Sequence, residues 1–194
     1  MNTRKPLLPP GWYPRTPQAI KDFLRGELAT SEASFKRVSP LASRLSCPQA
    51  GQDKPAALPP SAGVLPPRRH RVIAAAAPHA GWYYSGAIAA KALEALASGA
   101  LASPGGGNWT GTVAVIGGHL PPGVPALFAP EDAVETPLGS LEMDGELRAS
   151  LGRDLPAAGL DRAPDCYTDN TVEVLLPMVK YFFPAARLLW LRLP

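Results

Sequence analysis

The sequence predicts an α/β domain with a mainly parallel central sheet and flanking helices. Residues 72–77 and 112–116 are short, continuous apolar runs of the kind that form buried strands. Residues 85–97 lie between them and have a helix-forming composition. A strand, a helix and a strand within about 45 residues form a βαβ unit, whose strands pair in parallel. The chain has 194 residues, enough for a single domain with a substantial core.

The N-terminal third predicts one helix and one long connection. Residues 1–15 are punctuated by prolines and are expected to be coil. Residues 17–29 predict an amphipathic helix, with Pro17 suited to its first turn. From about 38 to 70 the sequence is rich in Pro, Ser, Ala and Gly, and we expect a mobile insertion within the single domain 1–194.

The remaining elements follow the second apolar run. Residues 135–144 (ETPLGSLEMD) resemble a short hairpin, and a helix is expected from Gly145 to about Leu151. Residues 171–182 predict a further helix despite Pro177. Residues 187–193 form a third apolar run, which we interpret as a buried strand.

Composition and charge restrict the classes of function. Apolar residues make up 46% of the chain and charged residues 18%, which is typical of a globular protein. The net charge is +3, but basic residues cluster only at Arg68, Arg69 and Arg71, so no nucleic-acid partner is expected. No apolar run is long enough for a signal peptide or a membrane span. Cys47 and Cys166 fit no CxxC spacing, which favours free thiols in the cytoplasm.

Two histidines follow the two strands of the predicted βαβ unit. His79 comes after residues 72–77, and His119 after residues 112–116. Ligands bind outside the carboxyl ends of parallel strands, so both imidazoles are expected over one sheet edge, within reach of one ion. Imidazole binds divalent iron, copper and zinc. The alternative, that each histidine only caps a turn by hydrogen bonding, stays open.

The segment PHAGWYYSG, residues 78–86, adds features of a binding pocket. Gly81 lets the backbone approach a bound group, and Ser85 can cap the following helix. Ser85 is a poor candidate for a hydrolase nucleophile, because no GxSxG elbow surrounds it. Three aromatic residues can either wall a pocket or pack in the core: Trp82, Tyr83 and Tyr84.

This segment resembles the PHAGYxYSG signature of the Memo family, whose prokaryotic members are called AmmeMemoRadiSam system protein B. Four other segments are similar to family elements in the same order. They are GWYP (11–14), VAVIGGHLPPG (113–123), ETPLGSLEMD (135–144) and DNTVEVLLPMVKYFFP (169–184). The sequence is identified as a divergent member of this family, with the resemblance covering most of the chain outside residues 38–70.

The resemblance implies a fold like that of the class III extradiol dioxygenases, in which non-haem iron lies in a cleft at strand ends. It also implies a site of two histidines and a cysteine, with iron or copper favoured over zinc as the divalent metal. Carried over by position, His79 and His119 are the first two metal ligands. The pocket residues are then Gly81, Trp82, Tyr83, Tyr84 and Asn170.

Three departures from the family pattern concern the site. Asn170 stands where the family has a histidine, which removes a general acid or base. The family's GPxHH turn is shortened to GGHL, without the second histidine. The family's third ligand lies beyond Pro194, so we expect the C-terminal part of the family domain to be absent. Cys166 is a poor substitute for it, although Asp169 and Glu173 could approach the cleft.

Two functions remain open at this point. The first is a metal-binding Memo-like protein with oxygen-dependent or redox chemistry, in which case it is a dioxygenase-like oxidoreductase. The second is a non-catalytic module of the same fold, which binds a partner or acts as a scaffold after losing the catalytic histidine and the third ligand. A small molecule or a peptide is the expected ligand of the cleft, with no membrane partner. The sequence specifies neither substrate nor oligomeric state.

Overall fold

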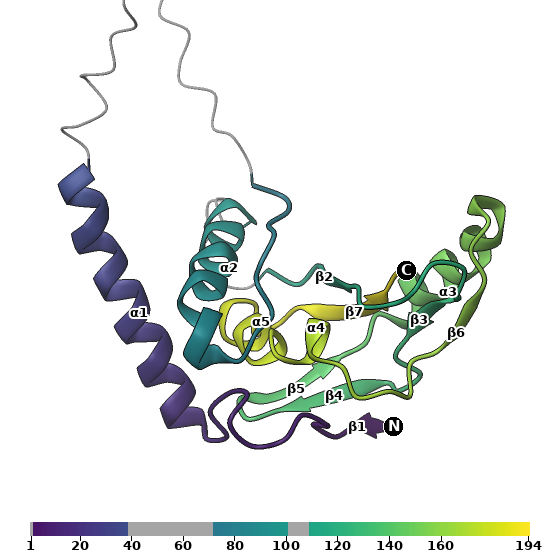
Figure 1. Cartoon of the computed structure of the whole chain (residues 1–194), viewed down its shortest axis with the longest axis horizontal. Coiled ribbons are helices and arrows are strands. Elements are labelled where there is room, and N and C mark those ends of the chain that lie inside the picture. The colour runs from purple at the N-terminus through teal and green to yellow at the C-terminus, as the bar shows by residue number, and fades with distance from the viewer. Residues whose placement is uncertain (1, 39–71, 101–108) are drawn as a thin grey trace, which may run out of the picture.

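A computed structural model describes residues 2–38, 72–100 and 109–194, and shows an α/β fold with two sheets (Figure 1). The larger sheet has the strand order β2-β7-β3-β6, and the smaller one the order β1-β4-β5. The strands of the larger sheet are β2 (Thr112–Gly117), β3 (Ala126–Phe128), β6 (Arg162–Pro164) and β7 (Arg187–Arg192). Those of the smaller sheet are β1 (Thr3–Arg4), β4 (Ala133–Thr136) and β5 (Gly139–Glu142).

The larger sheet is mixed but mainly parallel. Strands β2 and β7 pair in parallel from Thr112–Arg187 to Gly117–Arg192, and β3 pairs in parallel with β6. Strand β7 runs antiparallel to β3. The prediction of an α/β fold is therefore confirmed, and the hairpin over residues 135–144 is formed by β4 and β5. The dioxygenase-like arrangement of the elements stays a prediction.

The first predicted strand is wrong. Residues 72–77 form no strand, and Val72 and Ile73 are 37% and 81% exposed. Within the described residues β2 pairs only with β7, and its other edge makes no strand ladder with this segment. An apolar run needs a hydrogen-bonded partner to be buried as a strand. Here the run passes beside β2, with a cavity of about 440 Å³ between them.

Two helices are longer than the sequence predicts, and one is divided. Helix α1 covers Pro17–Val38, and α3 covers Gly145–Asp154, followed by the 3₁₀ turn η2 (Leu155–Ala158). The single helix expected over residues 171–182 is two helices, α4 (Asn170–Glu173) and α5 (Leu176–Phe182). Pro177 lies in the first turn of α5, where its missing N–H costs no helical hydrogen bond.

The segment after His79 also departs from the prediction. A π-helical turn, η1 (Trp82–Gly86), precedes α2 (Ala87–Ala100), so Ser85 lies inside this turn and does not cap the helix. Its hydroxyl donates instead to the carbonyl of Ala80. The mobile insertion predicted at about 38–70 lies outside the described residues, apart from Val38 at the end of α1.

The main core lies between the sheets and helices α1, α2 and α5. Its fully buried side chains include Ile20, Leu24, Leu141, Leu176, Met178, Phe183, Leu188 and Trp190. This packing holds α4 and β7 against β2, and thereby fixes the loops at the carboxyl end of β2. In the described part of the chain, no helix is long and apolar enough to cross a membrane.

Candidate metal site

The structure brings the two predicted histidines together. His79 follows the segment beside β2, and His119 lies two residues after the end of β2. Their Nε2 atoms are 3.2 Å apart, and the two rings meet edge to face. The imidazole of His119 is half exposed, so the pair faces solvent at the carboxyl edge of the sheet.

The backbone of His119 adopts an uncommon conformation. Its φ angle is +63°, the only positive φ of a non-glycine residue in the described ranges. Such a conformation costs about 1–3 kcal/mol unless the surroundings impose it. The β7 strand continues past this loop: the backbone N–H of Leu193 donates to Gly117, and Arg192 donates to the carbonyl of Gly118. These bonds fix the turn that presents His119.

The N-terminus of α4 contacts both histidines. The Asp169 carboxylate is 3.3 Å from Nδ1 of His119, and the amide of Asn170 donates to the carbonyl of His79 over 2.7 Å. Burial raises the pKa of Asp169, but the opposing effects prevail. Hydrogen bonds from the Thr171 hydroxyl and backbone, and then the charge of Arg192, hold this pKa below its ordinary value.

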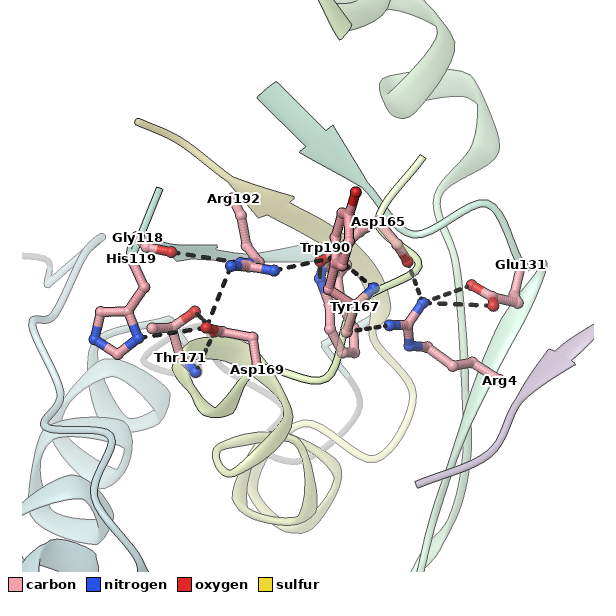
Figure 2. A network of polar contacts seen from close by, with 10 residues as sticks. All are labelled: Arg4, Gly118, His119, Glu131, Asp165, Tyr167, Asp169, Thr171, Trp190 and Arg192. Carbon is pink, nitrogen blue, oxygen red and sulfur yellow. Dashed lines mark hydrogen bonds and ion pairs between the residues drawn. The ribbon is translucent and has the colours of Figure 1, made fainter. Parts of the chain in front are cut away.

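A buried network of charges extends from this carboxylate into the protein (Figure 2). Arg192 bridges two carboxylates, Asp169 at 3.2 Å and Asp165 at 3.1 Å. Asp165 also accepts the indole N–H of Trp190, and its backbone carbonyl accepts a bond from Arg4. Buried charges are costly unless paired, and here each carboxylate has several donors. The network therefore holds the Asp169 side chain in one orientation.

The aromatic residues of the PHAGWYYSG segment are divided between core and surface. Trp82 is buried, packs on Phe23 and donates its indole N–H to the carbonyl of Val174, so it lies in the core rather than on a pocket wall. Tyr83 and Tyr84 are 89% and 81% exposed and contact each other edge to face. Gly81 lies close to the backbone of Trp12, not to open space.

Two further candidates, Glu173 and Cys166, make no hydrogen bond with either histidine in the described residues. Glu173 is buried and accepts hydrogen bonds from the backbone of Leu7 and Leu8 and from the Tyr13 hydroxyl. It therefore anchors the N-terminal segment. Burial, and then the charge of Glu173, raises the pKa of Tyr13. Cys166 is a free, exposed thiol.

Arg192 and Asp165 support the candidate site and were not predicted from the sequence. Both are buried and charged. Arg192 contacts the Asp169 carboxylate, which supports His119, and Asp165 contacts Arg192. The available signal was in RLLWLRLP: an arginine after five strand residues that are mostly apolar must find a carboxylate if it is buried. Which carboxylate it meets depends on the pairing of β7.

The spacing of the histidine nitrogens fits one metal ion. Two imidazole nitrogens about 2.0–2.1 Å from a common ion lie about 3 Å apart at angles near 90–110°. The observed 3.2 Å between the Nε2 atoms of His79 and His119 agrees with this spacing. Within the described residues no third His, Cys, Asp or Glu completes a group of metal ligands. The described residues thus bring two imidazole nitrogens to this spacing without a third such side chain.

The protein is thus an α/β protein with a mixed sheet. Its paired histidines form a candidate ligand site at the carboxyl end of β2, beside α4. A family model described as "Memo-like protein" matches residues 4–192. The chain belongs to the Memo-like family.

Curated relatives agree with this membership. The chain is 33% identical over 107 residues to a MEMO1 family protein of Sulfurisphaera tokodaii, covering 55% of the chain and 34% of the relative. It is 30% identical over 134 residues to one of Pyrobaculum arsenaticum, covering 68% of the chain and 44% of the relative. The chain thus spans less than half the length of these relatives.

Proposed function

We propose that this Memo-like protein binds one divalent first-row metal ion between His79 and His119. The observation that carries the proposal is the 3.2 Å separation of the two Nε2 atoms, which suits a shared ion. Neutral imidazole favours iron, copper and zinc over magnesium or calcium. Iron or copper is proposed in preference to zinc, because the family resemblance implies a redox-active metal.

The residues around the pair prepare it for such an ion. Because the Asp169 carboxylate faces Nδ1 of His119, this nitrogen carries the proton and Nε2 keeps its lone pair. In the metal-free protein Nε2 of His119 can then accept the Nε2–H of His79. Binding a cation would replace this hydrogen bond, and His79 would then ligate through Nε2 as a neutral imidazole with its proton on Nδ1.

An ion held by only two side chains retains open positions for a small ligand. A bound iron or copper ion supplies Lewis-acid and redox chemistry, and we propose oxygen-dependent chemistry on a small molecule as the activity of the site. Asn170 holds the backbone of His79 and moves no proton. Asp169 stays ionised, because its pKa is lowered, and so remains an acceptor for His119.

The second candidate is a non-catalytic binding module of the same fold. It is favoured by Asn170, which occupies the position of the family histidine, and by the two-ligand set in the described residues. Under this alternative the chain binds metal weakly or not at all.

The proposal is tested by metal content after anaerobic reconstitution with Fe²⁺, and separately with Cu²⁺ and Zn²⁺. We expect about one ion per chain in the wild type and none in the His79→Ala/His119→Ala variant. His70→Ala is the matched control, because it removes the third histidine of the sequence. Equal metal content in the wild type and the double variant would refute the site.

Oxygen uptake by the loaded protein then separates the two candidate functions. With a panel of catechols, metal-dependent uptake that the double variant lacks supports the oxidoreductase. Stoichiometric metal without uptake in any of these assays contradicts the oxygen-dependent activity, whereas little or no metal in the wild type favours the binding module.

A further inference from the structure

We propose that Asp169 and Asn170 are positioning residues which together bring His79 and His119 to the spacing of a shared metal ion. This inference rests on the proposed metal site. The two residues are consecutive, Asp169 as the N-cap of α4 and Asn170 as its first residue. One holds the imidazole of His119 and the other the backbone of His79. A single helix terminus thus controls both loops.

Asp169 divides its two carboxylate oxygens between the helix and the histidine. Oδ1 accepts hydrogen bonds from the backbone N–H and the hydroxyl of Thr171, which caps α4. Oδ2 contacts Nδ1 of His119 at 3.3 Å and Arg192 at 3.2 Å. A carboxylate behind an imidazole fixes its tautomer and orientation, as is common for histidines that bind metals. Asp169 therefore directs the Nε2 lone pair of His119 toward His79.

Arg192 makes this orientation rigid. Its side chain is only 5% exposed and is held from the other side by Asp165, which is fully buried. Asp165 in turn accepts the indole N–H of Trp190 on the same strand, β7. The Asp169 carboxylate is 11% exposed, so little solvent competes for its oxygens. The chain of contacts in Figure 2 thus connects the core of the sheet to the imidazole of His119.

Asn170 has the corresponding role for His79. The segment of residues 72–80 has no strand pairing among the described residues, so β2 does not fix its register. The 2.7 Å hydrogen bond from the Asn170 amide to the carbonyl of His79 supplies a fixed point instead. At a position where the resemblance implies a histidine, this chain therefore has a side chain that holds the backbone.

The test uses variants that keep the helix cap but lose the contact. Asp169→Ser preserves an N-cap oxygen but is too short to reach His119. Asn170→Asp has nearly the same size, but it places an acceptor against the carbonyl of His79. Asp144→Ser is the control, because Asp144 is the N-cap of α3 and contacts neither histidine. Asp169→Asn, which keeps both size and capping, replaces Asp169→Ser if the latter does not fold.

Two measurements are made on the full chain. The first is ¹⁵N NMR of the metal-free protein at a pH of about 8.5, where imidazole is generally neutral, to report the His119 tautomer. We expect the Nδ1–H form in the wild type, Asp144→Ser and Asn170→Asp, and a mixture in Asp169→Ser. The second is Zn²⁺ affinity, with Zn²⁺ as a redox-inert probe. We expect a 10- to 100-fold loss in Asp169→Ser and about 10-fold in Asn170→Asp.

The two measurements also separate this inference from the proposed function. If Asp169→Ser keeps the wild-type tautomer, the positioning role of Asp169 is overturned whatever the metal affinity. If Asn170→Asp binds Zn²⁺ as tightly as Asp144→Ser, the role of Asn170 is overturned. If the wild type binds no Zn²⁺ but the tautomer changes in Asp169→Ser, the metal site falls while Asp169 is still shown to orient His119.

Discussion

Replacing Glu173 by glutamine should destabilise the fold without touching the histidine pair. The carboxylate is buried and all three of its partners are donors: the backbone N–H groups of Leu7 and Leu8, each at 2.9 Å, and the Tyr13 hydroxyl at 3.0 Å. A glutamine offers one oxygen and one NH₂ group. Whichever way the amide is turned, its NH₂ faces at least one of these donors.

The expected cost follows from these contacts. A hydrogen bond to a charged group contributes about 1.5–3 kcal/mol, and a buried donor left unsatisfied costs about 1–3 kcal/mol. These contributions overlap, so we expect a loss of about 3 kcal/mol in the free energy of unfolding. For a chain of this size that corresponds to a fall in Tm of about 6–12 °C. The N-terminal segment should be the first part to detach.

The free energy of unfolding is measured by urea denaturation, with calorimetry for the Tm. The matched control is Glu142→Gln, the same chemical change at an exposed position of β5, which should lie within about 0.5 kcal/mol of the wild type. Equal stabilities of the two variants would show that Glu173 does not anchor the N-terminal segment. The reasoning from its three donors would then be wrong.

Two further predictions concern stability. Gly117→Ala places a Cβ that collides with the Thr171 hydroxyl and lies 2.9 Å from a Val172 methyl; we expect a loss of about 1–3 kcal/mol by denaturation, and a stability equal to wild type would contradict the close contact of β2 and α4. Hydrogen bonds, led by that from the Thr112 hydroxyl, lower the pKa of Asp144 below the ordinary 3.8. Burial raises the pKa of Asp169, but hydrogen bonds from Thr171 and the charge of Arg192 still bring it below 3.8, so the folded state binds fewer protons than the unfolded state. The stability they contribute is present above that value and is lost as the pH falls through the lowered pKa values; Asp144→Asn should flatten this acid slope in urea titrations, and an unchanged slope would refute the assignment.

Local sequence patterns determined most of the secondary elements. The apolar run 112–116 predicted β2, the run 187–193 predicted β7, and the segment 135–144 predicted the hairpin of β4 and β5. Those signals are local, because periodicity and turn chemistry act within a few residues. The failed prediction at residues 72–77 depends instead on a contact with a distant part of the chain. Apolar composition predicts burial, but a strand also needs hydrogen bonds to a neighbouring strand, and residues 72–77 form no ladder with β2.

The histidine pair was predicted from two parallel strand ends at one edge of a sheet. The two side chains do meet, although only His119 follows a strand. The charged residues that support His119 were not predictable from the sequence. Asp169, Arg192 and Asp165 come from two segments, and only the pairing of β7 with β2 and the packing of α4 bring their charges into contact. Likewise, Glu173 could have faced the site or the N-terminal segment, and the packing of that distant segment against α4 placed it against Leu8. The sequence by itself indicated the family, the two histidines of the candidate site and most of the elements. Tertiary structure decided which carboxylate each buried charge meets, because such contacts join residues that are distant along the chain.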